Sequence, residues 1–162
     1  MMKITLIYGT DTGNTRSIAK KIAKRLPDTS ALHIAKARRE DFENSDLLIL
    51  GSPTCGFGEL PEDWEKHLTL LATANLSGKT VALFGTADQL NYPGTFADAL
   101  GILYDKAVAS GATVIGQTGT EGYDFDQSAA LRDGRFVGLV IDQDNQANQT
   151  EERITSWLGQ IL

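Results

Sequence analysis

Cysteine is nearly absent from this chain, with only Cys55 among 162 residues. A single thiol excludes an intramolecular disulfide framework, and this fits a reducing compartment. Long hydrophobic runs are absent as well, since the N-terminal run over residues 4–8 ends at Gly9. Such a run is too short for a signal-peptide core or a membrane span. We therefore expect a cytoplasmic protein with no membrane partner.

Positively charged residues are fewer than negatively charged ones: the chain has 15 Lys and Arg and 21 Asp and Glu, and its formal net charge is −6. An acidic chain is a poor ligand for nucleic acid, so we expect no nucleic-acid partner. The charge is also uneven, because residues 1–40 are basic on balance while residues 41–162 are strongly acidic. Two interpretations stay open, an ordinary solvated acidic surface or a polarised molecule steered onto basic partners.

Histidine is scarce too, and no catalytic arrangement stands out. The two histidines, His33 and His67, lack the Cys or carboxylate spacing of a metal site. No Ser-His-Asp or Cys-His order is visible, and Cys55 has neither a partner cysteine nor a flanking base. We therefore predict no catalytic residue and no metal ligand, and a structural or solvated role for both histidines.

What the sequence does contain is an alternation of apolar runs and helical periodicity. This alternation predicts an α/β fold, with a parallel sheet covered by helices on both faces in one domain over residues 1–162. The polar, Gly-rich residues 118–135 interrupt the last strand as an insertion. Strands are expected at residues 3–8, 31–34, 46–51, 80–85, 113–117 and 136–141, and helices at 16–26, 61–71, 96–107 and 151–162.

Three loops rich in Gly, Thr and Asp follow three of these strands, at residues 9–15, 52–60 and 85–95. In an open α/β sheet, ligands bind outside the carboxyl ends of the strands. The three loops are therefore expected to converge on one ligand site.

The first loop has hydroxyls and glycines but no lysine. A nucleoside-triphosphate loop needs G-x-x-x-x-G-K-[ST], and a dinucleotide loop needs G-x-G-x-x-G; neither is present. A receiver-type phosphorelay domain is excluded because Tyr8 and Gly9 stand where acidic residues belong. A low-molecular-weight phosphatase is excluded because Pro61 stands six residues after Cys55, where an arginine is needed. What remains is a phosphate held by neutral donors at the start of a helix.

The residues 10–15, read as T-x-T-G-x-T, resemble the phosphate loop of flavodoxins. The second loop, at residues 53–60, is similar to the second flavin loop of that family, and residues 84–89 with Tyr92 to the third. Residues 122–125 and 136–139 resemble the insertion that marks long-chain flavodoxins, and residues 142–146 and 153–154 complete the pattern. The chain is therefore identified as a member of the flavodoxin family, of the bacterial long-chain type.

This resemblance implies the strand order 2-1-3-4-5, with five parallel strands, and FMN as the bound cofactor. It implies that the hydroxyls of the first loop hold the FMN phosphate, and that Tyr92 stacks on the outer face of the ring. The cofactor-binding residues implied are Thr10, Asp11, Thr12, Gly13, Asn14, Thr15, Thr54, Cys55, Gly56, Phe57, Gly58, Thr86, Ala87, Asp88, Tyr92, Thr95 and Asp144.

Two positions of the second loop matter for the flavin ring. In the family, a peptide at the position of Gly56 turns over when flavin N5 takes a proton, and glycine makes that change easy. Cys55 departs from the family, because many long-chain flavodoxins have a tryptophan there. Losing an aromatic contact removes about 0.5–1.5 kcal/mol beyond its area, so FMN binding should weaken without being lost. Whether Phe57 covers the ring instead stays open.

By this resemblance the protein is a low-potential one-electron carrier that shuttles between the semiquinone and hydroquinone of FMN. A ferredoxin–NADP reductase or a nitrogenase reductase is its expected partner, and we expect a monomer.

One alternative is an FMN-dependent NAD(P)H:quinone reductase, although Tyr92 on the ring would block its substrate pocket. The other is a non-redox binding module, against which the intact first loop argues. Acidic residues in or beside the loops should lower the second potential and dock basic partners: Glu59, Glu62, Asp63, Glu65, Asp88, Asp98 and Asp144.

Overall fold

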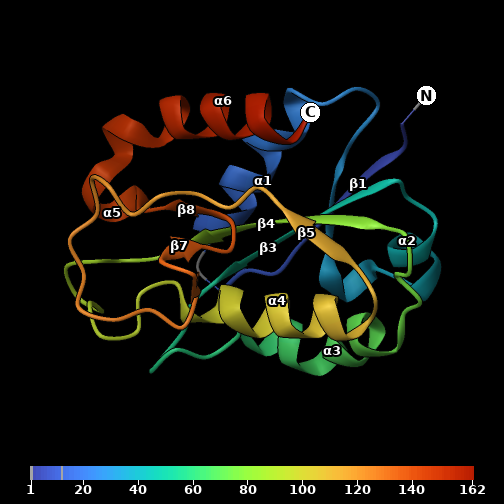
Figure 1. The fold of residues 1–162 in the computed structure, drawn as a ribbon, viewed down its shortest axis with the longest axis horizontal. Coiled ribbons are helices and arrows are strands. Elements are labelled where there is room, and N and C mark those ends of the chain that lie inside the picture. The colour runs from blue at the N-terminus through green and yellow to red at the C-terminus, as the bar shows by residue number, and fades with distance from the viewer. Residues whose placement is uncertain (1, 12) are drawn as a thin grey trace.

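The protein folds around one twisted parallel sheet (Figure 1). The structure, a computed structural model, describes residues 2–11 and 13–162. The strands of the main path lie in the order β2-β1-β3-β4-β5, as the sequence predicted. They are β1 (Ile4–Tyr8), β2 (Ala31–His33), β3 (Leu47–Pro53), β4 (Thr80–Thr86) and β5 (Thr113–Ile115).

The last position of the sheet is shared by two short strands, which confirms the predicted interruption. β5 pairs with residues 80–82 of β4, and β8 (Leu139–Ile141) pairs with residues 84–86 of the same strand. Between them the chain leaves the sheet and forms a small hairpin of β6 (Leu131–Arg132) and β7 (Arg135–Phe136). The insertion therefore leaves the sheet edge beside the first residues of β4 and returns to it beside the carboxyl end of β4.

Helices cover both faces of the sheet (Figure 1). α1 (Asn14–Lys24) and α6 (Thr150–Ile161) lie on one face, and α3 (Glu62–Thr73) and α4 (Asp98–Ala109) lie on the other. The short helices were not predicted, because three to five residues are too few to show a helical period. They are α2 (Arg39–Glu43), α5 (Gln143–Gln146) and the 3₁₀ turns Ile34–Lys36 and Ala147–Gln149.

Each face of the sheet has its own core, because alternate side chains of a strand point to opposite faces. In β1, Leu6 packs under α1 and α6 while Ile7 packs under α3 and α4. Trp64 and Trp157 are buried, one in each core, as the sequence predicted. Each indole Nε1 donates a hydrogen bond of 2.9 Å to a backbone carbonyl, from Trp64 to Gly51 and from Trp157 to Gly116.

The insertion is fastened to the α4 face by an aromatic cluster of Phe96, Tyr123, Phe125 and Phe136. The Tyr123 hydroxyl donates to the Val140 carbonyl at 2.5 Å. Burial raises the pKa of this phenol to about 12, although the Arg153 guanidinium over its ring acts in the opposite direction. A neutral, partly buried phenol thus ties the insertion to β8.

Some element ends differ from the sequence prediction. The helical stripe that starts at Phe96 becomes helix only at Asp98, because Ala97 has a left-handed backbone with φ of 57°. The run at residues 136–141 is split between β7 and β8. Within the part of the chain that the structure describes, no helix combines the length and the apolar character needed to cross a membrane.

Candidate functional site

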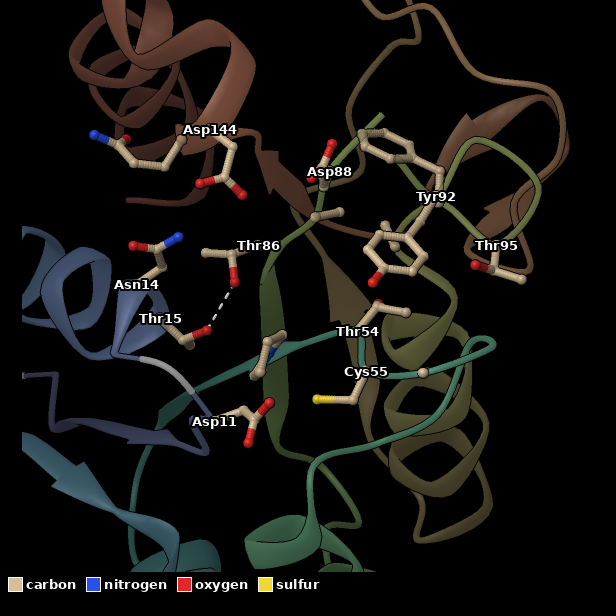
Figure 2. Close-up of a pocket in the computed structure, with 16 residues that line it drawn as sticks. Asp11, Asn14, Thr15, Thr54, Cys55, Thr86, Asp88, Tyr92, Thr95 and Asp144 are labelled. Atoms are coloured by element: carbon tan, nitrogen blue, oxygen red, sulfur yellow. Dashed lines mark hydrogen bonds between the residues drawn. The ribbon is translucent and has the colours of Figure 1, made fainter. Parts of the chain in front are cut away.

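A pocket of about 220 Å³, open on one side, lies at the carboxyl ends of β3 and β4 and the start of α1. All three predicted loops contribute to it, so their predicted convergence is confirmed. In Figure 2, Asp11, Asn14 and Thr15 form one side and Tyr92 and Thr95 the other. The lining residues are Asp11, Asn14, Thr15, Pro53, Thr54, Cys55, Gly56, Thr86, Ala87, Asp88, Tyr92, Thr95, Phe96, Ala97, Gln143 and Asp144.

Most of the residues predicted for the site line this pocket. Thr10, Gly13, Phe57 and Gly58 do not line it, and Thr12 lies outside the described residues. Phe57 is 89% exposed at the tip of the second loop. Four lining residues were not predicted from the sequence: Pro53, Phe96, Ala97 and Gln143. Three of them are direct neighbours of a predicted residue and Ala97 is two positions from Thr95, and this proximity was the only available signal.

The start of α1 differs from the start of every other α-helix described. Gly13 is its N-cap and offers no side-chain acceptor, and no acidic residue occupies its first turn. Helices α2 to α6 each carry at least one Asp or Glu there. The first N–H groups of a helix have no partner within it, and together with the helix dipole they attract an anion. The amides of α1 are therefore left for an external anion.

Two buried threonines lie beside these amides. Their hydroxyl oxygens, Thr15 Oγ1 and Thr86 Oγ1, are 2.7 Å apart (Figure 2). Thr15 is 1% exposed and Thr86 is 7% exposed. A hydroxyl both donates and accepts, so one member of the pair can turn its hydrogen into the pocket. The first loop is closed by a further bond of 3.1 Å, from the Gly13 amide to Thr10 Oγ1.

No lysine or arginine lines the pocket, whereas Asp11, Asp88 and Asp144 do. Partial burial acts to raise the pKa of Asp88, but hydrogen bonds from Asn91, Asn145 and Leu90 outweigh it and lower the pKa. Asp88 is therefore charged at neutral pH. The Asn145 amide nitrogen donates both to Asp88 Oδ1, at 2.8 Å, and to the buried Asp142. The third loop is fixed to α5 by this bridge.

Cys55 points its sulfur towards the Asp11 carboxylate inside the pocket (Figure 2). The second loop is a tight turn here, because Cys55 and Glu59 exchange two backbone hydrogen bonds of 2.7 Å. Burial, followed by the negative charges of Asp11, Asp63 and Glu59, raises the pKa of the thiol to about 11. The thiol is thus neutral at pH 7 and a poor nucleophile.

One exposed aromatic side chain lines the pocket. Tyr92 is half exposed, and its amide donates to the Asp88 carbonyl at 3.0 Å. Leu90 on the third loop and Phe57 on the second loop are also exposed, but neither lines the pocket. Among the described residues, no group of three or more His, Cys, Asp or Glu is placed to hold a metal ion.

Comparisons with known proteins agree with this geometry. The family model described as flavodoxin matches residues 6–157. The chain is 44% identical to a flavodoxin of Helicobacter pylori, covering 99% of this chain and 97% of that one, and 46% identical to a flavodoxin of Klebsiella pneumoniae with the same coverage. It is also similar to the solved structure of Fusobacterium nucleatum flavodoxin bound to flavin mononucleotide, with a TM-score of 0.92 at 32% identity. That match covers 99% of this chain and 97% of the other. This chain therefore belongs to the flavodoxin family.

Proposed function

We propose that the pocket between the three loops holds FMN, with its phosphate at the start of α1. The observation that carries this proposal is that α1 alone among the α-helices described starts without a side-chain cap or an acid. The amides of Asn14 and Thr15 and the Thr15 hydroxyl supply donors for a phosphate. Neutral donors suffice here, which agrees with the lack of a lysine in the first loop.

As a member of the flavodoxin family, the chain is an FMN-dependent electron carrier and not an enzyme. Bound FMN supplies one-electron redox chemistry, while the protein provides binding, orientation and electrostatics. The pocket is open on one side, so an edge of a bound ring remains accessible to a redox partner. Nothing in that exchange requires a substrate cavity.

The other predicted residues lie around the flavin ring in this proposal. Tyr92, at the mouth of the pocket, stacks on the outer face. Cys55 lies where the family often has tryptophan and offers a small neutral thiol to the inner face. Phe57 is almost fully exposed and does not line the pocket, so its contact is with a partner protein. The backbone of Gly56 and Gly58 gives the second loop its sharp turn.

The charge of the pocket favours a low potential. The lining carries three carboxylates and no cation, and each added electron raises the negative charge nearby. The thiol of Cys55 is uncharged at neutral pH, so it does not add to that field. The carboxylates therefore disfavour full reduction of the bound cofactor.

The finer assignment is a long-chain flavodoxin that forms one domain over residues 1–162 and acts as a cytoplasmic monomer. Support for the long-chain type comes from the insertion between β5 and β8. A ferredoxin–NADP reductase or a nitrogenase reductase is the partner, because an acidic pocket mouth suits a basic docking surface. The basic residues 1–40 then serve to orient the molecule in the field of that partner.

Titration with FMN, followed by stepwise reduction, tests the proposal. The purified protein should quench FMN fluorescence with one site per chain and should not oxidise NADH or NADPH by itself. Adding a ferredoxin–NADP reductase should then start electron flow from NADPH through the protein to cytochrome c. Rapid oxidation of NADPH without the reductase would favour the quinone reductase, and absence of FMN binding would leave only a non-redox module.

A further inference from the structure

Asp63 lies in the first turn of α3, outside the pocket lining, yet its carboxylate reaches the first loop. Its Oδ2 accepts a hydrogen bond from the Thr10 amide at 2.8 Å and one from His33 Nε2 at 2.9 Å. Its Oδ1 accepts from the Trp64 amide at 2.7 Å. One carboxylate thus joins the loop after β1, the end of β2 and the start of α3.

This carboxylate is well shielded from solvent. The Asp63 side chain is 15% exposed and that of His33 is 30% exposed. An ionised carboxylate only accepts hydrogen bonds, so His33 Nε2 carries the hydrogen in this pair. The His33 ring also packs against the Tyr8 ring, with centroids 5.4 Å apart. His33 is therefore held on two sides and orients the Asp63 carboxylate.

A second contact fixes the same segment to α3. The Gly51 carbonyl accepts hydrogen bonds from both the Gly9 amide and Trp64 Nε1, each 2.9 Å long. Gly9 lies so close to α3 that a Cβ atom there would meet Asp63 Oδ1 and Trp64 Nε1 at 2.7 Å. The backbone at residues 9–10 is thereby clamped from β3 and from α3, immediately before the loop that leads into α1.

Electrostatics alone would place no carboxylate here, because a negative charge beside a phosphate site repels the ligand. The presence of Asp63 is explained by its hydrogen bonds. A loop fixed in its binding conformation before the ligand arrives loses less entropy on binding. A fixed Thr10 peptide sets where the rest of the loop begins and hence where the amides of α1 lie.

We propose that Asp63, oriented by His33, is a positioning residue for the phosphate end of the FMN site and so sets the preference for FMN over riboflavin. This inference rests on the proposed function, because it assumes that the first loop holds the phosphate. Asp63 acts through the Thr10 amide, and it contributes to the affinity only of a flavin that carries a phosphate. Riboflavin has the same ring without the phosphate, so its binding is independent of Asp63.

The test compares the dissociation constants of FMN and riboflavin for the Asp63→Asn variant of the full chain. An amide has one acceptor oxygen, so it cannot serve both the Thr10 and the Trp64 amides. FMN should bind about tenfold more weakly, which equals about 1.4 kcal/mol, and the affinity for riboflavin should be unchanged. The matched control is Glu62→Gln, which removes the same charge from the same helix turn. Among the described residues Glu62 forms an ion pair with Lys66 alone, so both affinities should match the wild type.

A second variant, His33→Phe, keeps a ring against Tyr8 and removes the donor to Asp63. It should weaken FMN binding in the same direction and leave riboflavin binding unchanged, even if Asp63→Asn fails to fold. Equal weakening of both ligands, or wild-type affinity for FMN in both variants, would overturn the positioning role. Wild-type protein that binds riboflavin as tightly as FMN would instead overturn the proposed phosphate site itself.

Discussion

The hydroxyl pair of Thr15 and Thr86 offers a direct way to separate folding from ligand binding. Valine has nearly the shape of threonine, so Thr15→Val removes one hydroxyl and leaves Thr86 Oγ1 without its partner at 2.7 Å. Leaving a buried hydroxyl unpaired costs about 1–3 kcal/mol. Because Thr86 lines the pocket and water can reach it there, we expect the lower end, about 1 kcal/mol.

Thr86→Val leaves Thr15 Oγ1 unpaired instead, and Thr15 is only 1% exposed. The cost should then be about 2 kcal/mol, because the orphaned hydroxyl is more deeply buried. In the double variant both hydroxyls are gone, and two apolar groups of the same shape face each other at nearly no cost. The double-mutant cycle should therefore give a coupling energy of about 2–3 kcal/mol between the two positions.

Urea unfolding of the protein without FMN measures these stabilities. A fluorescence titration with FMN measures the binding of the same four proteins. Thr15→Val should weaken FMN by about 10- to 150-fold, because it removes a hydrogen bond to a charged phosphate worth about 1.5–3 kcal/mol. The double variant should regain stability but not affinity. Additive stability losses would refute the importance of the pair, and wild-type affinity in the double variant would refute the role of Thr15 in holding phosphate.

Three further perturbations test other parts of the site. Tyr92→Ala should weaken FMN binding about tenfold by removing a stacked ring, which a fluorescence titration detects, and an unchanged affinity would contradict stacking. The pKa of about 11 predicts that Cys55 reacts slowly with iodoacetamide at pH 8 and faster towards pH 11. Because the thiol pKa is raised on folding, the stability of the protein without FMN should also fall as the pH rises from 9 to 11. Gly56→Val should shift both one-electron potentials of bound FMN, because a φ of 50° at this position strains a β-branched residue. Spectroelectrochemical titration measures both potentials, and unchanged values would exclude a role for this peptide.

The sequence was a good guide to the fold because strands and helices repeat their apolar residues with different periods. The run at residues 80–85 and the stripe of Ile18 and Ile22 each have one plausible structure, and both are found as expected. The short helix α2 was missed because five residues hold little more than one turn. The break between β7 and β8 was missed because Val137 and Gly138 look like strand residues in a continuous apolar run.

The candidate site could be located, but its supporting contacts could not. The convergence of three loops follows from the parallel sheet, and so most lining residues were found. The bond from Thr10 to Asp63 joins residues that are 53 positions apart, and the bond from Asn145 to Asp88 joins residues 57 positions apart. No local pattern marks such pairs. Phe57 was expected at the site from its place in the loop, but the tight turn between Cys55 and Glu59 directs its side chain into solvent.

The short strands at both edges of the sheet have a consequence for aggregation. β2 forms one edge with three residues, and β5 and β8 form the other edge with three residues each. A long, flat edge of unpaired amides and carbonyls is a template on which a second chain can add a strand. Here each edge strand is short, and the insertion interrupts the edge formed by β5 and β8. Neither edge of the sheet therefore presents a neighbouring chain with an extended strand to pair with, whether or not FMN is bound.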